Sequence, residues 1–200
     1  MKAGVAYRIT TQELPPPTHS YEFLLAENGI FIRGVKPGLQ VQFPLAICSI
    51  RGLFPLKSYL QLEAPRVPRP LVEELVAVAM GQETEILFYL SWEQECNHWQ
   101  LTIPDQNPGT ADVTPNDTAS DQYRRALIEC HSHGGYPAFF SQQDNQDEEG
   151  FRIYAVLGNL PHRPTLRTRI GLFGHFWEVP STSIFELPPG ILSPEYGGDK

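Results

Sequence analysis

Hydrophobic and polar residues alternate over short stretches in the first 60 positions of the chain. Asn28-Gly29 separates the first two stretches, and Pro37-Gly38 separates the second from the third. An alternation with period two is typical of β-strands, and Asn-Gly is a strong hairpin signal. The pattern therefore predicts an N-terminal β-rich extension over residues 1–64. Its stretches are "YEFLLAE", "GIFIRGV" and "LQVQFPLAICSI".

The hydrophobic period changes to that of a helix after the proline-rich joint "APRVPRP". Pro70 suits the first helical position, and Gly81 can end the helix. Glu73 and Glu74 are expected in the first turn, where negative charge complements the helix dipole. The spacing predicts a helix over residues 71–80. Its expected buried face consists of Leu71, Leu75 and Val78.

The remaining pattern predicts a mixture of strands and one short helix. Polar residues fill positions 105–121, which we expect to form a mobile loop, and residues 187–200 are expected to form a flexible tail. A short polar helix is expected over residues 141–149. We therefore expect an ordered α+β domain over residues 65–186. Its expected strands are "ETEILFYLSW", "HWQLTIP", "RRALIECHSH", "FRIYAVLGNL" and "TLRTRIGLFGHFWEV".

The composition indicates the cellular compartment and limits the classes of partner that we expect. No apolar run approaches the ~18 residues of a membrane span, and the start "MKAGVAYRITTQ" lacks the features of a secretory signal. Three cysteines without a C-x-x-C pair fit a reducing compartment, so we expect a cytoplasmic protein without a membrane partner. The net charge is −8, and no dense Lys/Arg cluster could follow a phosphate backbone. We therefore expect no nucleic-acid partner.

The chain holds a pair of histidines, His131 and His133, one residue apart in a predicted strand. Residues i and i+2 of a strand point to the same side roughly 6.5 Å apart, so both imidazoles can reach one metal ion. Two histidines on a half-exposed strand are the alternative interpretation. Cys130 points to the opposite side, which disfavours a cysteine–histidine nucleophile and favours a buried packing role.

Ser141 and Asp144 stand three positions apart at the start of the short polar helix. A serine followed three residues later by an acidic residue is typical of a capping box. A serine hydrolase is disfavoured, because "FFSQQ" lacks the glycines of a nucleophile elbow. A role in a metal site remains open.

Taken together, these residues resemble a known family. H-x-H, seven residues and S-x-x-D, with a glutamate on an earlier strand, is similar to the signature of the JAB/MPN/JAMM zinc isopeptidases. The run "HSHGGYPAFFSQQDNQDEEGFRIYAVLGNL" resembles a bacterial branch, the PRTRC system protein A group. The resemblance covers roughly Val67 to Pro180.

The resemblance implies a mixed β-sheet flanked by helices, the MPN fold, and a set of site residues. His131, His133 and Asp144 would hold Zn²⁺, and Ser141 would donate a hydrogen bond to the oxyanion. The general base would be a glutamate at the head of the strand after the first helix. Glu83 and Glu85 both sit there with the same strand parity, and Glu85 is favoured because it begins the run "ILFYL".

The implied activity is hydrolysis of peptide or isopeptide bonds, with the C-terminal tail of a ubiquitin-like or sulfur-carrier-like protein as the candidate substrate. The alternative is a non-catalytic MPN scaffold, although such relatives usually lose a metal ligand. The chain departs from eukaryotic members at Gly134, where they have proline. Tyr136, Phe140 and the polar stretch 105–121 are expected beside the substrate cleft.

Overall fold

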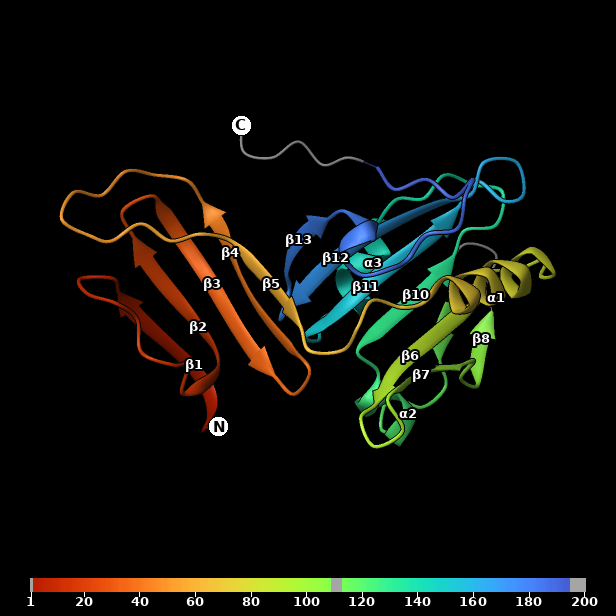
Figure 1. The fold of residues 1–200 in the computed structure, drawn as a ribbon, viewed down its shortest axis with the longest axis horizontal. Helices are drawn as coiled ribbons and strands as arrows, with labels where there is room; N and C mark the ends of the chain where they lie inside the picture. Colours follow the sequence, from red (N-terminus) through yellow and green to blue (C-terminus); the bar gives the residue numbers. More distant parts are fainter. Residues whose placement is uncertain (1, 109–112, 195–200) are drawn as a thin grey trace. The chain divides into compact units, whose positions relative to one another are not determined.

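The computed structural model describes residues 2–108 and 113–194, and the chain divides into two compact units (Figure 1). The N-terminal unit is Met1–Glu63, and the C-terminal unit is Ala64–Lys200. Each unit has its own sheet. The mixed α+β class expected from the sequence is confirmed.

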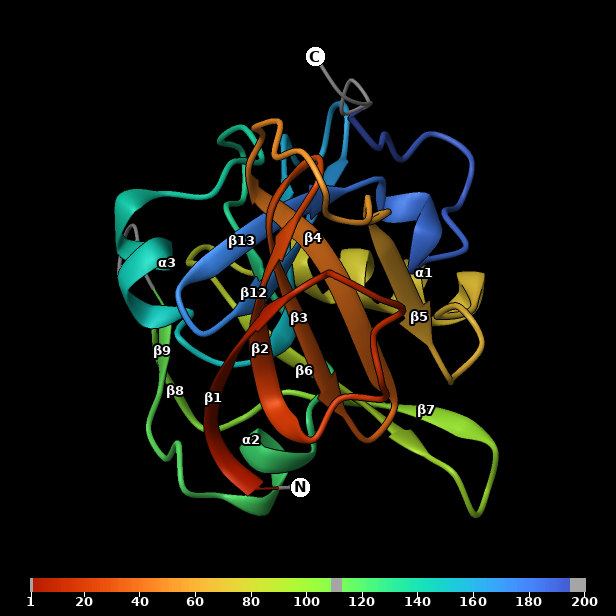
Figure 2. The same cartoon turned by 90° about the vertical axis from the view of Figure 1, so that its left-hand side faces the viewer.

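The N-terminal unit is a five-stranded sheet whose strands follow chain order (Figure 2). Strands β1 and β2 are parallel, and the other neighbours are antiparallel. Ala26 pairs with Gly29, so the predicted Asn28-Gly29 hairpin is confirmed. The strands are β1 (Lys2–Ile9), β2 (His19–Ala26), β3 (Gly29–Lys36), β4 (Leu39–Ala46) and β5 (Tyr59–Leu62).

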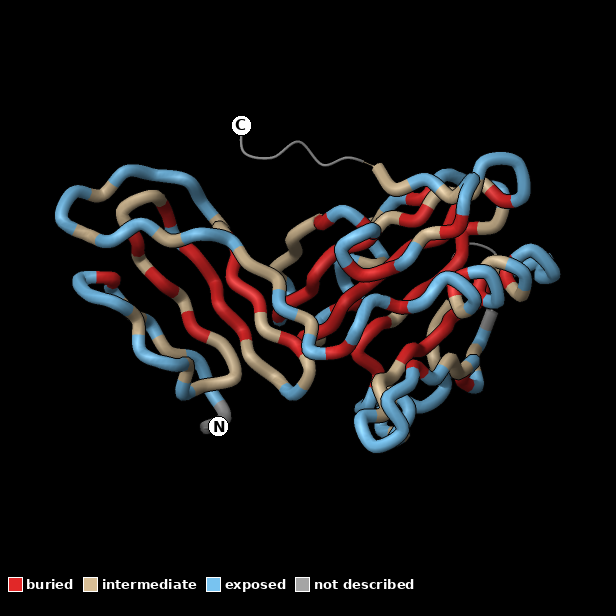
Figure 3. The backbone as a smooth tube through the Cα atoms, viewed as in Figure 1, coloured by how far each residue is buried: buried red, intermediate tan, exposed pale blue. Residues whose placement is uncertain are grey.

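The C-terminal unit contains a six-stranded mixed sheet in the order β13-β12-β11-β10-β6-β7. Only the central pair β10 and β11 is parallel among its described neighbours. Every residue of β11 is buried, and the buried stretches of the central strands are red in Figure 3. A strand buried on both faces is a rigid support for a site. The strands are β6 (Leu87–Glu93), β7 (His98–Thr102), β10 (Ile128–Ser132), β11 (Arg152–Gly158), β12 (Thr165–Leu172) and β13 (His175–Val179).

The first helix, α1 (Arg69–Met80), differs in detail from the prediction. It begins one residue before Pro70, so Glu73 and Glu74 lie beyond the first turn, which contains no acidic residue. The buried face was predicted correctly only in part, because Leu75 is buried whereas Leu71 and Val78 are half-buried. Gly81 caps the C-terminus as expected. The residues of α1 that are buried are Val72, Leu75 and Ala79.

The polar stretch 105–121 is more ordered than the prediction of a mobile loop. It contains an antiparallel pair of short strands, β8 (Gln106–Pro108) and β9 (Val113–Pro115), while residues 109–112 lie outside the described part of the chain. A short helix, α2 (Asp121–Arg125), follows. Hydrogen bonds between β8 and β9 explain this order. The sequence did not reveal the two strands, because it has no hydrophobic alternation here.

The expected flexible tail is also partly ordered. A 3₁₀ helix, η1 (Ser181–Ser183), precedes it, and Leu192 then forms a bridge to Thr165. The Leu166 N–H donates to the Leu192 carbonyl at 2.8 Å. Residues 195–200 lie outside the described residues. No helix within the described ranges is long and apolar enough to cross a membrane.

Candidate metal centre

The central strand β10 positions the two histidines. His131 lies in β10 opposite Leu87 of β6 and Val156 of β11, and His133 follows the end of the strand. The His133 N–H donates to the Leu157 carbonyl at 2.8 Å, which extends the ladder by one residue. Both side chains are buried, and their Nε2 atoms are 3.1 Å apart. The predicted convergence of the two imidazoles is confirmed.

The third residue, Asp144, comes from the short helix α3 (Gln142–Asp147). The Ser141 hydroxyl accepts from the Asp144 N–H at 3.1 Å, and Asp144 Oδ2 accepts from the Ser141 N–H at 2.5 Å. This is the predicted capping box. It occupies one carboxylate oxygen and leaves Oδ1 at 3.4 Å from His131 Nε2. Capping therefore orients Asp144 toward the histidines, and the two interpretations of this motif are compatible.

The three donors fit a tetrahedral metal ion. One ligand atom from each of His131, His133 and Asp144 lies within 4.8 Å of the others. Bonds of about 2.0–2.1 Å at tetrahedral angles separate two ligand atoms by roughly 3.3 Å. The observed separations of 3.1 Å and 3.4 Å lie on either side of that value. Two imidazole nitrogens and one carboxylate oxygen are a donor set that zinc accepts, and they leave one position open.

The protonation states of the histidines also suit metal binding. His133 Nδ1 lies 3.1 Å from the Pro137 carbonyl, and a carbonyl only accepts, so Nδ1 must donate. In the neutral ring Nε2 then carries no proton, so its lone pair can coordinate a metal ion. Burial lowers the pKa of His131 to about 4, with His133 and Arg169 acting in the same direction and Asp144 opposing them. His131 is therefore neutral at neutral pH.

Glu85 lies beside the same cluster, in the segment that leads into β6. The Ile86 N–H donates to Ser132 Oγ at 3.2 Å, and the Ser132 N–H donates to the Ile86 carbonyl at 3.0 Å. These bonds place Glu85 Oε1 at 4.0 Å from His133 Nε2. Glu83 is exposed, whereas Glu85 is half-buried. Strand parity could not choose between the two glutamates because they share it, and both in fact precede β6, which begins at Leu87.

Arg169 supports the cluster from β12, and no local sequence pattern indicated this role. Its Nε donates to Glu148 at 2.7 Å, and its Nη1 donates to Asn145 at 2.6 Å. The guanidinium lies over the rings of Phe140 and Phe176, at 4.0 Å and 3.8 Å from their centroids. Arg169 thereby binds helix α3 to the sheet. Phe140 thereby has a packing role, which was the alternative interpretation of this aromatic residue, and its predicted contact with substrate stays a prediction.

The turn between the ligands depends on two glycines. Gly134 has φ +54°, which proline cannot adopt, so the backbone after His133 differs from one built on proline. A Cβ on Gly158 would lie 2.4 Å from the Ala138 nitrogen, so only glycine permits this close approach. The turn leaves Tyr136 71% exposed and places the Phe139 ring edge-on to His133 at 4.9 Å. Phe139 was not singled out from the sequence.

Two neighbouring features complete the surroundings of the centre. Gln106 of β8 exchanges two hydrogen bonds with the backbone of Leu87, at 2.7 Å and 3.3 Å, so the polar stretch begins beside the strand that pairs with His131. Cys130 is buried, and burial raises the pKa of its thiol far above the usual range. Its predicted packing role is consistent with both observations.

Comparison with known proteins agrees with the geometry. The family described as prokaryotic homologs of the JAB domain matches residues 59–170, which is more than half of the chain. The match contains all three candidate ligands as well as Glu85 and Ser141. No curated protein matches the chain.

Proposed function

The chain belongs to the family of prokaryotic homologs of the JAB domain, and from that premise we propose that it is a zinc-dependent hydrolase of the JAMM type. It cleaves peptide or isopeptide bonds. The single observation that carries the proposal is the convergence of His131, His133 and Asp144 at separations suited to one tetrahedral ion. A complete donor set with an open position favours a catalytic centre over the alternative, a non-catalytic MPN scaffold.

Three residues would hold the ion, and two others would move or stabilise charge. Bound zinc would act as a Lewis acid and lower the pKa of a coordinated water toward about 7. Glu85, with Oε1 at 4.0 Å from His133 Nε2, is placed to take a proton beside the ligand atoms and to deliver it to the leaving amine. Acid–base catalysis of this kind contributes about 10²–10⁴-fold in rate.

Ser141 is the proposed donor to the oxyanion that develops as the scissile carbonyl is attacked. Its oxygen accepts from the Asp144 N–H, so its own proton remains available for donation. A fixed donor of this kind is worth about 3 kcal/mol of the barrier. The capping box holds the Ser141 backbone in place, which keeps this hydroxyl in a fixed position relative to Asp144.

The proposed substrate is an extended C-terminal tail of a ubiquitin-like or sulfur-carrier-like protein, handled in the cytoplasm without nucleic acid or membrane. The likeness of the run from His131 to Leu160 to the PRTRC system protein A group supports placement in that bacterial branch. An extended tail suits a site that has an exposed aromatic turn and the contact of β8 with Leu87 in its surroundings, because backbone hydrogen bonds can hold such a tail.

The test compares Glu85→Gln with its matched control Glu83→Gln. Each zinc-reloaded protein is incubated with a synthetic library of extended peptides that carry small residues before the scissile bond, and products are counted by mass spectrometry. Glu85→Gln should keep about one zinc per chain and lose about 10²–10⁴-fold in rate, while Glu83→Gln stays active. Zinc-loaded wild type that cleaves no member of the library would favour the scaffold alternative.

A further inference from the structure

The N-terminal unit carries a row of polar side chains that the metal centre does not use. Direct cross-strand pairing places Glu22 of β2 beside Arg33 of β3, Arg33 beside Gln42 of β4, and Gln42 beside Tyr59 of β5. Directly paired residues lie on the same face of a sheet. Glu22, Arg33 and Gln42 are all buried. Burying so many polar groups is costly unless they have partners.

The charges in this row do not balance. Arg33 donates to Glu22 through Nε at 3.1 Å and through Nη2 at 2.5 Å, while Arg8 donates to the other carboxylate oxygen at 3.0 Å. Two guanidinium groups thus share one carboxylate. Arg33 Nη2 also donates to the Pro15 carbonyl, but Nη1 has no hydrogen-bond partner within residues 2–108 and 113–194. Since Nη1 is not one of the fully buried unpartnered nitrogens of the described residues, it is accessible and can donate to an anion from outside the chain.

A pocket of about 500 Å³ opens on this row. One wall is polar, because Gln42 uses only one of its two amide protons, on the Lys57 carbonyl, and burial raises the pKa of Tyr59 so that its hydroxyl stays protonated. Apolar residues from the covering segments form the other wall. The lining residues central to the argument are Arg33, Gln42, Tyr59, Leu14, Phe54 and Leu56.

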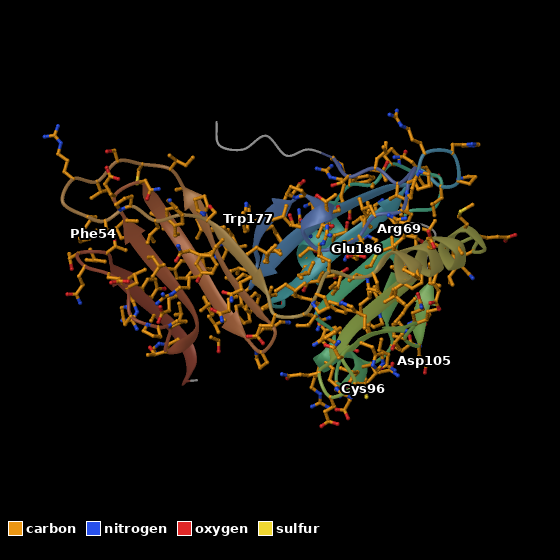
Figure 4. All side chains as sticks on the ribbon, in the orientation of Figure 1. Phe54, Arg69, Cys96, Asp105, Trp177 and Glu186 are labelled. Atoms are coloured by element: carbon orange, nitrogen blue, oxygen red, sulfur yellow. The ribbon has the colours of Figure 1, made fainter. Side chains whose placement is uncertain are left out.

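The apolar wall is fixed by hydrogen bonds on the segment between β4 and β5. The Phe54 N–H donates to the Thr10 carbonyl at 2.8 Å, and the Phe54 carbonyl accepts from the Thr10 hydroxyl at 2.9 Å. The Asn28 side chain accepts from the Leu56 N–H and donates to the Leu56 carbonyl. Phe54, labelled in Figure 4, is 54% exposed. The pocket is therefore preformed, with an aromatic side chain at its mouth.

We propose that this pocket binds a carboxylate attached to an apolar or aromatic body. The carboxylate would accept from Arg33 Nη1, with Gln42 and Tyr59 as further donors, and the body would lie against Phe54 and Leu56. One free guanidinium nitrogen and neutral donors fit a monoanion better than a phosphate, which usually requires several cations. Glu13 also lines the pocket, but it is exposed and its charge is screened.

The same chemistry is available in a free small molecule and in the C-terminus of a peptide. The probes are 3-phenylpropionate, its neutral amide, and the acetylated tripeptide Ala-Leu-Phe with either a free or an amidated C-terminus. Binding to the full chain is followed by shifts of backbone amide signals in NMR spectra. Both free acids bind with shifts at residues 10–14 and 54–59, and each amide binds about tenfold more weakly or worse.

Variants distinguish a pocket that recognises the carboxylate charge from a surface that binds apolar molecules nonspecifically. Phe54→Glu places a negative charge at the mouth and should weaken binding of 3-phenylpropionate at least fivefold, whereas the matched control Ile47→Glu, also on an exposed residue of the same segment, should leave it unchanged. Arg33→Lys keeps the charge, loses the guanidinium fork and should weaken binding as well. Circular dichroism confirms that each variant folds. Equal binding of acid and amide, equal effects at Phe54 and Ile47, or no binding of any probe would overturn the proposal.

Discussion

The two compact units each bury an arginine that holds a glutamate, but they balance the charge differently. In the N-terminal unit, Arg33 and Arg8 both donate to Glu22. In the C-terminal unit, Arg169 alone pairs with Glu148, and Phe140 and Phe176 cover the faces of its guanidinium. The first arrangement leaves a surplus cation beside a pocket. The second pairs one guanidinium with one carboxyl group and is packed on both sides.

The difference shows how one kind of ion pair can serve two purposes. Burial raises the pKa of Glu22, but hydrogen bonds from Arg8 and Arg33 outweigh it and lower the pKa to about 2. Burial raises the pKa of Glu148 to about 8, because one arginine opposes it only in part. A one-to-one pair acts as a brace for helix α3. A two-to-one cluster keeps its carboxylate ionised and retains capacity for another anion.

The largest expected effect is loss of metal from the C-terminal unit. His131→Ala combined with His133→Ala should reduce zinc from about one per chain to none, because two of three ligands are removed. His162→Ala combined with His175→Ala is the matched control, and it should keep the zinc. Elemental analysis after demetallation and reloading measures the content. Equal zinc in the two double variants would show that the metal site lies elsewhere in the chain.

The next largest effect is the loss of stability when either buried arginine is replaced by methionine. Arg169→Met should lower the free energy of unfolding by about 3–5 kcal/mol, since it leaves Asn145 and the buried Glu148 without their hydrogen-bond donor and removes the guanidinium packed between Phe140 and Phe176. Arg33→Met should cost less, about 1–3 kcal/mol, since Glu22 keeps Arg8 and the Thr18 N–H. Arg169→Met should also weaken zinc binding, because Arg169 holds α3 through Asn145 and Glu148.

Hydrogen exchange resolved by segment measures the two losses separately, with residues 19–46 reporting on Arg33→Met and residues 141–158 on Arg169→Met. A zinc titration of each variant supplies the second measurement. A larger loss at Arg33, or unchanged zinc affinity in Arg169→Met, would contradict the assignment of Arg169 as the brace of the metal centre.

The sequence predicts a region well when the interacting residues lie close together along the chain. The candidate ligands lie within 14 positions, at the end of one strand and in the first turn of the next helix, so spacing and strand parity suffice to bring them together. Arg169 follows Asp144 by 25 positions, and only the pairing of β12 with β11 brings it under α3. The pairing between strands is a tertiary property that a local pattern does not contain.

The polar row of the N-terminal unit was missed for the same reason. Its members are spread over four strands and become neighbours only through the register of three strand pairs. The partly wrong face predicted for α1 has a related cause. Leu71 and Val72 are adjacent hydrophobic residues, and contact with the rest of the unit, which the local pattern does not contain, decides that Val72 is the more deeply buried of the two.

The two buried glutamates should respond to pH in opposite directions. Glu22 has a folded pKa near 2, below the ordinary value of 4.5, so its stabilisation is present above pH 4.5 and is lost as the pH falls toward 2. The loss amounts to about 3 kcal/mol for the N-terminal unit. Glu148 has a raised pKa, so its contribution is present below pH 4.5 and is lost as the pH rises through about 8.

Hydrogen exchange corrected for intrinsic pH dependence tests these opposite slopes. Protection of residues 19–46 should fall between pH 4.5 and 3 in the wild type, and the fall should be much smaller in Glu22→Gln. Protection around α3 should change in the other direction over the range from pH 5 to 8. If protection changed with pH in the same direction in both units, the proposed electrostatic difference between them would be wrong.

The smallest expected effect concerns two glycines in matched surroundings. Gly134 in the C-terminal unit has φ +54° and Gly52 in the N-terminal unit has φ +87°, and a Cβ at either position would meet nothing within 4 Å. Alanine at each should therefore cost about 1 kcal/mol of stability through backbone strain alone. Gly134 directly follows His133, so Gly134→Ala should also weaken zinc binding by a few-fold, while Gly52→Ala leaves it unchanged. Thermal melts and competition titrations with a zinc chelator measure the two quantities. Equal zinc affinity in both variants would mean that the bonds of His133 to the Leu157 and Pro137 carbonyls hold the imidazole regardless of strain in the next residue.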